Sequence, residues 1–169
     1  MMILFVTVGS TSFDELISVL DTESFYDECN KTGFSRIVFQ IGKGDYIPCK
    51  HTYFKGIVEW FRYRTSIHEY IASASLVISA GGAGTMSETL KLRKPLIVVI
   101  NNSLLHNHQV ELASKFQSLS CLLTASNPCE VRSLLRTALV YDFKPLPESH
   151  PELLCDFLIS KYFEKNKTT

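Results

Sequence analysis

The sequence has no excess of either charge. Its 17 lysine and arginine side chains are matched by 17 aspartate and glutamate side chains, and the formal net charge at pH 7 is +0. A neutral chain lacks the overall positive field that attracts nucleic acid or anionic lipid. We therefore expect no nucleic-acid partner.

Cysteine is also scarce, and no two cysteines form a Cys-X-X-Cys pair. An odd, scattered set of five favours free thiols in a reducing compartment over a disulfide framework or a zinc site. His106, His108 and Glu111 suggest a metal at first sight. Residues two positions apart on a helix point in different directions, however, so we expect neither a metal nor another cofactor.

No apolar run approaches the roughly 20 residues that a membrane-spanning helix needs. The N-terminal stretch "MMILFVTVG" is apolar but short, and it has neither a basic leader nor a small-residue cleavage site. We interpret it as a buried strand rather than a signal peptide. The expected location is cytoplasmic, and membrane association would need a partner.

Glycine and proline are sparse as well, with eight and six residues among 169, whereas 46% of the residues are hydrophobic. This composition is typical of one folded domain of ordinary size, which we place at residues 1–144. For residues 145–169 we expect a proline-containing linker and an amphipathic C-terminal helix. The apolar face of that helix holds Leu154, Phe157, Leu158 and Tyr162. The sequence leaves open whether this face packs on its own domain or on a partner.

Apolar runs alternate with helical patterns along the chain. We predict strands at residues 3–8, 36–41, 76–79, 96–100 and 121–123, and a weaker edge strand within 56–63 that is either parallel or antiparallel. Helices are predicted from Asp14 onward with Thr11 or Ser12 as N-cap, at 66–74 with Ser66 as cap, and at 84–92, 107–116 and 130–140. The alternation predicts an α/β, Rossmann-like fold, in which a mostly parallel sheet carries helices on both faces. The order of its strands stays open.

The stretch "ISAGGAGTMSETL", residues 78–90, has three glycines in four positions directly behind a predicted strand. In open parallel sheets, ligands bind beyond the carboxyl ends of the strands, where loops lead into helix N-termini. Free amides and the helix dipole make such a turn a seat for phosphate. A tight turn with close helix packing explains the glycines equally well.

Two common nucleotide-binding motifs do not fit this turn. A Walker A loop needs Lys followed by Ser or Thr after its last glycine, and the chain has no such sequence there. A dinucleotide fingerprint needs a third glycine where this chain has Ser87. Glu88, one helical turn after Gly84, suits a ribose diol instead, although favourable placement in the helix dipole is the simpler alternative. The combination favours a nucleoside diphosphate.

Three segments together resemble a known family: "VTVGSTSFDEL", "ISAGGAGTMSETLKLRKPLIVVI" and "NHQVELA". They are similar to the catalytic subunit of the bipartite UDP-N-acetylglucosamine transferase of dolichol-linked oligosaccharide synthesis. That subunit is in turn similar to the C-terminal, donor-binding half of MurG-type glycosyltransferases of the GT-B fold. The resemblance runs from residue 3 to residue 116, with order and spacing intact.

The resemblance implies a set of donor-binding residues. Residues 9–11 would lie near the phosphates, 82–85 would carry the diphosphate, and 88 would hold the ribose. The backbone at 63–64 would contact uracil, and 107–109 would hold the sugar. The residues are Gly9, Ser10, Thr11, Tyr63, Arg64, Gly82, Ala83, Gly84, Thr85, Glu88, Asn107, His108 and Gln109. One departure from the family pattern is Ala80, where relatives usually carry histidine, followed by Gly81 in place of alanine.

The function that the resemblance implies is inverting transfer of N-acetylglucosamine (GlcNAc) from UDP-GlcNAc to the lipid-linked acceptor GlcNAc-diphosphodolichol. The family implies a membrane-anchored, acceptor-binding partner subunit that supplies the general base and recruits this chain to the cytosolic face of the endoplasmic reticulum. We therefore assign no catalytic residue within this chain. Two alternatives stay open: a nucleotide-binding regulatory or scaffolding module without transfer activity, and a dinucleotide-dependent oxidoreductase.

Overall fold

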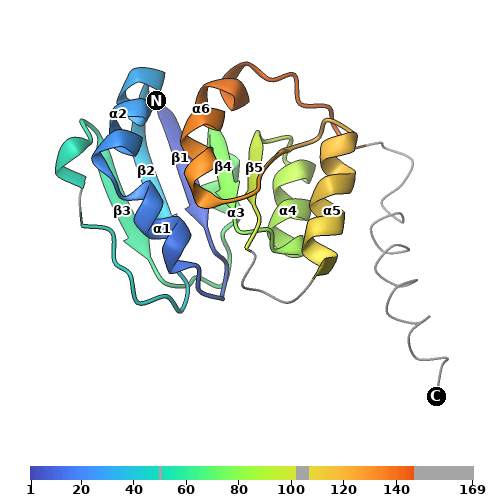
Figure 1. Ribbon diagram of the computed structural model, residues 1–169, viewed down its shortest axis with the longest axis horizontal. Coiled ribbons are helices and arrows are strands. Elements are labelled where there is room, and N and C mark those ends of the chain that lie inside the picture. Colours follow the sequence, from blue (N-terminus) through green and yellow to red (C-terminus); the bar gives the residue numbers. More distant parts are fainter. Residues whose placement is uncertain (50, 102–106, 147–169) are drawn as a thin grey trace.

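A computed structural model describes residues 1–49, 51–101 and 107–146 of the chain. Its centre is a six-stranded sheet with the order β3-β2-β1-β4-β5-β6 (Figure 1). The strands are β1 (Met2–Thr7), β2 (Phe34–Gln40), β3 (Ile57–Phe61), β4 (Leu76–Ser79), β5 (Leu96–Val99) and β6 (Leu123–Ala125). This arrangement confirms the predicted Rossmann-like sheet.

Every pairing of neighbouring strands in this described sheet is parallel, including that of the edge strand β3 with β2. The antiparallel alternative for the edge strand is therefore wrong. The reason is that the chain crosses back over the sheet between β2 and β3, by way of residues 41–56, instead of turning in a hairpin.

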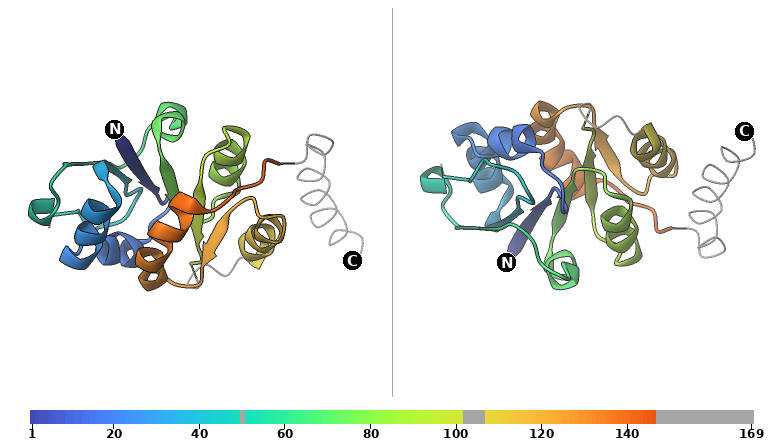
Figure 2. Two further views of the ribbon diagram at one scale, coloured as in Figure 1. Left: turned by 90° about the horizontal axis from the view of Figure 1, so that it is seen from above. Right: turned by 90° about the horizontal axis from the view of Figure 1, so that it is seen from below.

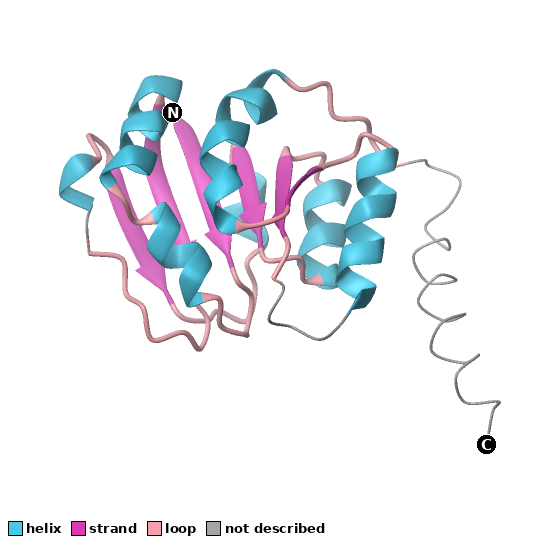
Figure 3. Cartoon of the chain, in the orientation of Figure 1, coloured by secondary structure: helices cyan, strands magenta, loops and turns pink. Residues whose placement is uncertain are grey.

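Helices cover both faces of the sheet (Figures 2 and 3). They are α1 (Asp14–Leu20), α2 (Glu23–Thr32), α3 (His68–Ser73), α4 (Ala83–Lys91), α5 (Asn107–Ser118) and α6 (Val131–Val140), with short 3₁₀ turns η1 (His51–Tyr53) and η2 (Pro128–Glu130). Buried side chains of α1, α2 and α6 form one apolar cluster, and those of α3, α4 and α5 form the other.

The central strand β1 contributes to both clusters because successive side chains of a strand point to opposite faces. Leu4 and Val6 belong to the cluster with α1, α2 and α6, whereas Phe5 belongs to the other. All residues of β4 and β5 are buried as well. Burial on both faces explains why these strands appear in the sequence as unbroken apolar runs.

The sequence prediction missed a helix between the first two strands. One helix was expected there, but α1 ends at Leu20 and α2 begins at Glu23. The break follows from Asp21, whose buried carboxylate accepts a hydrogen bond from the Tyr26 hydroxyl at 2.7 Å. This contact accompanies a break between the two helices that no glycine or proline marks in the sequence.

The predicted N-caps were also wrong. Phe13 is the residue before α1, and no side chain caps that helix. The Thr11 hydroxyl instead donates to the carbonyl oxygen of Val8 at 2.9 Å, so it closes the turn after β1. Ile67, not Ser66, precedes α3, although the Ser66 hydroxyl accepts a hydrogen bond from the His68 amide at 3.3 Å.

The last strand, β6, begins at Leu123, two residues later than the predicted start at Cys121. The Cys121 amide donates to the Phe116 carbonyl at 2.9 Å, so Cys121 lies in the turn that closes the C-terminal end of α5, after its last residue Ser118. The predicted C-terminal helix lies outside the described residues. Among the helices that are described, none has the length and apolar character needed to cross a membrane.

Candidate functional site

The strand order changes direction between β1 and β4. The chain proceeds outward from β1 through β2 to β3 and then returns to the other side of β1, where β4 pairs with it. Thr7 and Ser79 are register partners near the carboxyl ends of the two strands, and the Ala80 amide donates to the Thr7 carbonyl at 3.0 Å. The loops after both strands thus meet at the crevice where such sheets bind ligands.

The glycine turn after β4 contains one position that needs glycine for the backbone. Gly81 has φ +86°, a left-handed conformation that side chains disfavour. Its amide donates to the Ser79 hydroxyl at 3.2 Å. A tight turn therefore explains Gly81 without a ligand.

Gly82 and Gly84 are not explained in this way. A Cβ placed on Gly84 would meet no heavy atom within 4 Å, and one on Gly82 would meet only the Thr85 hydroxyl, at 3.9 Å. Close packing inside the protein therefore does not demand glycine at either position. Their bare backbone leaves open space at the start of α4, where a ligand can approach.

The N-terminus of α4 has no cap from the described side chains. Gly82 is the N-cap residue and supplies no side-chain hydrogen bond, and the Met86 amide makes the first helical bond, to the Gly82 carbonyl at 3.0 Å. The amides of Ala83, Gly84 and Thr85 precede that bond and have no acceptor within the helix. Three donors without a helical acceptor, at the positive end of the helix dipole, suit a diphosphate.

A buried polar pair, Thr7 and Gln40, stabilises the turn after β1. The Gly9 amide donates to the Thr7 hydroxyl at 3.0 Å, and that hydroxyl donates to Oε1 of Gln40 at 2.6 Å. Thr7 and Gln40 are 1% and 2% exposed. Gln40 belongs to no recognisable motif, and the sequence did not predict it as a site residue. It nevertheless links the carboxyl end of β2 to the turn after β1.

The loop after β2 supports the same turn from the side. The Lys43 amide donates to the Thr11 carbonyl at 2.9 Å, and a Cβ on Gly42 would collide with that carbonyl oxygen. Ser10 and Thr11 are themselves exposed at the surface. The turn of residues 9–11 is therefore fixed in its backbone while its outer side is accessible.

Glu88 makes a contact that the sequence did not predict. Its Oε1 lies 3.0 Å from Nδ1 of His68, the first residue of α3. From the sequence alone, His68 is interpreted as a surface or structural histidine and not as a site residue. The pair joins α3 to α4 beside the glycine turn.

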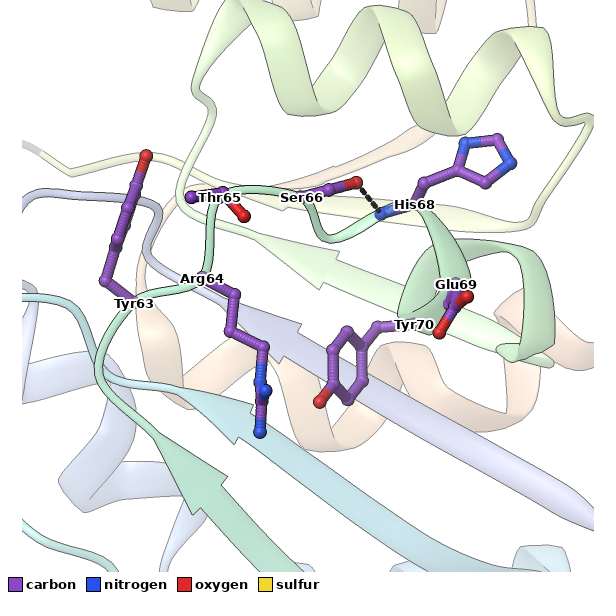
Figure 4. Close-up of a pocket in the computed structure, with 7 residues that line it drawn as sticks. All are labelled: Tyr63, Arg64, Thr65, Ser66, His68, Glu69 and Tyr70. Atoms are coloured by element: carbon purple, nitrogen blue, oxygen red, sulfur yellow. Dashed lines mark hydrogen bonds between the residues drawn. The ribbon is translucent and has the colours of Figure 1, made fainter.

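Tyr63 and Arg64 line an open pocket of about 810 Å³ that runs along residues 63–70 (Figure 4). The Arg64 guanidinium stacks over the rings of Phe61 and Tyr70, at 5.1 Å and 5.7 Å from their centroids. Figure 4 shows the side chains of Tyr63 and Arg64 pointing in opposite directions. Stacking holds the Arg64 side chain against these two rings, so the backbone of residues 63–64 is the part that a ligand in the pocket can contact.

Gln109, in the first turn of α5, reaches the glycine turn. A Cβ placed on Gly81 would lie 3.7 Å from Oε1 and 4.0 Å from Cβ of Gln109. Asn107 and His108 are the first two residues of α5, but their side chains are outside the described part of the structure. His106 lies outside it altogether. Within the described residues, no group of three or more His, Cys, Asp or Glu side chains could hold a metal ion.

Comparison with known proteins identifies the family. The glycosyltransferase family 28 C-terminal domain matches residues 3–148. The Saccharomyces cerevisiae protein named UDP-N-acetylglucosamine transferase subunit ALG13 is 31% identical over 181 aligned residues, which cover 87% of this chain and 89% of the yeast protein.

Human and mouse proteins of the same name are 43% identical over 111 residues and 34% identical over 167 residues. These alignments cover 66% and 89% of this chain, respectively. The aligned part amounts to only 10% of the human protein and 14% of the mouse protein, so both relatives are far longer.

Solved structures agree with this relationship. A solution NMR structure of ALG13 superimposes with a TM-score of 0.70 at 28% identity, covering 96% of this chain and 97% of that one. Acinetobacter baumannii MurG shares the fold, with a TM-score of 0.57 at 15% identity over 95% of this chain and 50% of that one. From the matched family domain, the yeast relative and this shared fold, we conclude that the chain belongs to the glycosyltransferase family 28 C-terminal domains.

Proposed function

We propose that this chain is the donor-binding subunit of a UDP-GlcNAc transferase. Together with a membrane-anchored partner subunit, it transfers GlcNAc to GlcNAc-diphosphodolichol in the second step of N-glycan precursor assembly. The observation that carries the proposal is the uncapped start of α4, where Gly84 faces open space and three amides have no helical acceptor. The names of the relatives, which describe transferase subunits, support it.

The proposed donor extends along the carboxyl edge of the sheet. Residues 82–85 hold the diphosphate, with the turn of residues 9–11 beside them across the β1–β4 pairing. Glu88 accepts hydrogen bonds from the ribose, and the backbone at Tyr63 and Arg64 contacts uracil. Gln109, which lies against Gly81, holds the sugar together with Asn107 and His108. All of these roles extend the family resemblance to this chain.

The proposed reaction is an inverting displacement at the anomeric carbon. The acceptor hydroxyl loses its proton to a general base, its oxygen bonds to the anomeric carbon, and UDP leaves with the electrons of the broken bond. The amides at the start of α4 stabilise the charge that develops on UDP, because their direction is set before the reaction. We place the base on the partner subunit, and we expect the isolated chain to catalyse little transfer.

We further propose that residues 1–144 are the nucleotide-sugar-binding domain and 145–169 the linker and C-terminal helix. The partner would recruit this cytoplasmic chain to the cytosolic face of the endoplasmic reticulum. Deleting residues 151–169 tests the role of the C-terminal helix. Loss of folding would show that the helix covers its own domain, and loss of association with intact folding would show that it binds the partner.

Titration calorimetry tests the choice of ligand directly. We expect heat of binding with UDP and UDP-GlcNAc and none with NAD. The reverse result would overturn the proposal in favour of an oxidoreductase.

Transfer activity, assayed with the partner present, separates an enzyme subunit from a regulatory or scaffolding module. Glu88→Ala and Gln109→Ala should each lower the rate, whereas Lys115→Ala, an exposed change on the same helix as Gln109, should not. Wild-type rates in both site variants would favour the nucleotide-binding module.

A further inference from the structure

We infer that His68 is a positioning residue that orients the Glu88 carboxylate for a nucleotide ribose. This inference rests on the proposed function, because it takes Glu88 as the ribose acceptor. His68 does not touch the nucleotide in this proposal and acts only through Glu88. It adds a residue from α3 to a site otherwise formed by the loops after β1, β3 and β4 and by α4 and α5.

The contact itself is a hydrogen bond of ordinary length. Nδ1 of His68 lies 3.0 Å from Oε1 of Glu88, within the range of an N–H···O bond. In the described part of the structure, this bond is the one polar contact of either side chain. Since a carboxylate only accepts hydrogen bonds, Nδ1 of His68 carries the hydrogen and donates it.

This bond leaves most of the carboxylate available. An ionised carboxylate has about four acceptor positions on its two oxygens, and His68 occupies one of them. Oε2 and the remaining lone pair of Oε1 can still accept the two hydroxyls of a ribose. A glutamate already held in one rotamer loses less conformational entropy when the ligand binds.

The location of His68 supports a role in binding rather than in folding. Its side chain is 57% exposed and that of Glu88 is 35% exposed. Exposed pairs of this kind contribute little to stability. His68 also lines the pocket of residues 63–70, and Figure 4 shows its ring turned away from Tyr63 and Arg64.

A hydrogen bond at the start of α3 fixes the backbone from which the His68 side chain projects. The His68 amide donates to the Ser66 hydroxyl at 3.3 Å, the hydrogen bond drawn in Figure 4. The same short segment contains Tyr63 and Arg64, where we place the uracil. His68 therefore couples the segment that contacts the base with the carboxylate that contacts the ribose.

The test compares the affinities of UDP and 2′-deoxy-UDP by calorimetry, because Glu88 can distinguish them only through the 2′-hydroxyl. The wild-type chain should bind UDP roughly tenfold more tightly, as expected for a hydrogen bond to a charged group. Glu88→Ala should remove this preference. His68→Leu should reduce the preference to about threefold or less, while the midpoint of urea unfolding stays unchanged.

Two further variants separate positioning from other effects. His68→Asn should retain most of the preference, because its amide nitrogen can donate from nearly the position of Nδ1. The double variant His68→Leu with Glu88→Ala should behave like Glu88→Ala alone, since His68 acts through Glu88. Ser73→Ala, an exposed change on the same helix, is the control and should bind like the wild type.

The outcomes distinguish this inference from the proposed function. If Glu88→Ala keeps the preference for UDP, the ribose role of Glu88 is wrong and the inference falls with it. If Glu88→Ala loses the preference but His68→Leu keeps it at the wild-type value, only the inference is overturned. A His68→Asn variant that behaves like His68→Leu would also overturn it, because a restored donor should restore the effect.

Discussion

Gln109 lies against Gly81: a Cβ placed on this glycine would be 3.7 Å from Oε1 of the glutamine. The turn after β4 and the first turn of α5 therefore adjoin, although β5 separates them in the chain. The proposed diphosphate and sugar sites are thus neighbours. Glycines at the two ends of this turn serve different purposes, and their substitution should have opposite effects on stability.

Gly81→Ala should destabilise the fold. The backbone at this position has φ +86°, and an alanine held in a left-handed conformation costs roughly 1–2 kcal/mol. Urea unfolding, followed by circular dichroism, measures the change. An unchanged free energy of unfolding would mean that the turn adopts another conformation.

Gly84→Ala should leave the fold intact or stabilise it. Gly84 lies in α4, its added Cβ would meet no atom within 4 Å, and alanine is favoured over glycine in a helix by about 0.5–1 kcal/mol. UDP should nevertheless bind at least tenfold more weakly, because the methyl group projects into the open space at the helix start. Calorimetry checks this, and wild-type affinity for UDP would argue against a phosphate at this position.

Gln40→Leu should destabilise the chain by about 1–3 kcal/mol, because the buried Thr7 hydroxyl would lose its acceptor. The change should also weaken UDP binding, since the same hydroxyl accepts the Gly9 amide. Denaturant unfolding and calorimetry measure the two effects. Thr137→Ala, at an exposed position of α6, serves as control. Full stability of Gln40→Leu would show that the Thr7 hydroxyl finds another acceptor.

Asp21→Ala should destabilise the chain more than Tyr26→Phe does. The Asp21 carboxylate is fully buried and accepts hydrogen bonds from Tyr26, Tyr46 and the Cys49 amide at 2.7, 2.9 and 2.8 Å. Removing the carboxylate leaves all three donors without this acceptor. Each donor that stays buried then lowers the free energy of unfolding by about 1–3 kcal/mol. Tyr26→Phe removes a single bond, worth roughly 0.5–1.5 kcal/mol. Equal effects in urea unfolding would contradict this account.

Stability should fall in alkaline solution. Burial, reinforced by the hydrogen bond to Asp21, raises the pKa of Tyr46 from 10.0 to about 12, and burial raises the pKa of Tyr26 as well. The folded chain thus holds these protons more tightly than the unfolded chain. Their contribution is complete below pH 10. That of Tyr46 is lost as the pH rises through about 12, and that of Tyr26, whose pKa is raised further, decreases over the same interval.

Urea unfolding at a series of pH values measures this loss. Tyr46→Phe should show a smaller decrease in stability over the same pH interval, because it lacks one of the groups whose pKa is raised by folding. A decrease as steep as that of the wild type would assign the effect to other residues.

Much of the fold could be predicted from the sequence. The strand β4 has the predicted bounds, and α4 begins one residue before the predicted position. Both follow from local signals, an apolar run and a glycine turn. The helix α2 was missed because Asp21 and Thr22, which separate it from α1, resemble ordinary helix residues in their context. The effect of Asp21 depends on its contacts with Tyr26 and with the more distant Tyr46 and Cys49.

The glycine turn, Glu88 and Gln109 could be singled out because motif and resemblance mark them. His68 and Gln40 could not, since each gains its role from a side chain on another element. A hydrogen bond between such residues depends on strand order and helix packing, and neither leaves a signal in the neighbouring residues.

Apolar periodicity and backbone requirements act over a few residues, so the fold class, the family and the position of the glycine turn could be inferred from the chain alone. The strand order, the parallel edge strand and the pairing of His68 with Glu88 become apparent only in the folded domain. These features join segments that are distant along the chain. Their geometry is set by the crossover connections and by burial on both faces of the sheet, which act only once the whole domain is assembled.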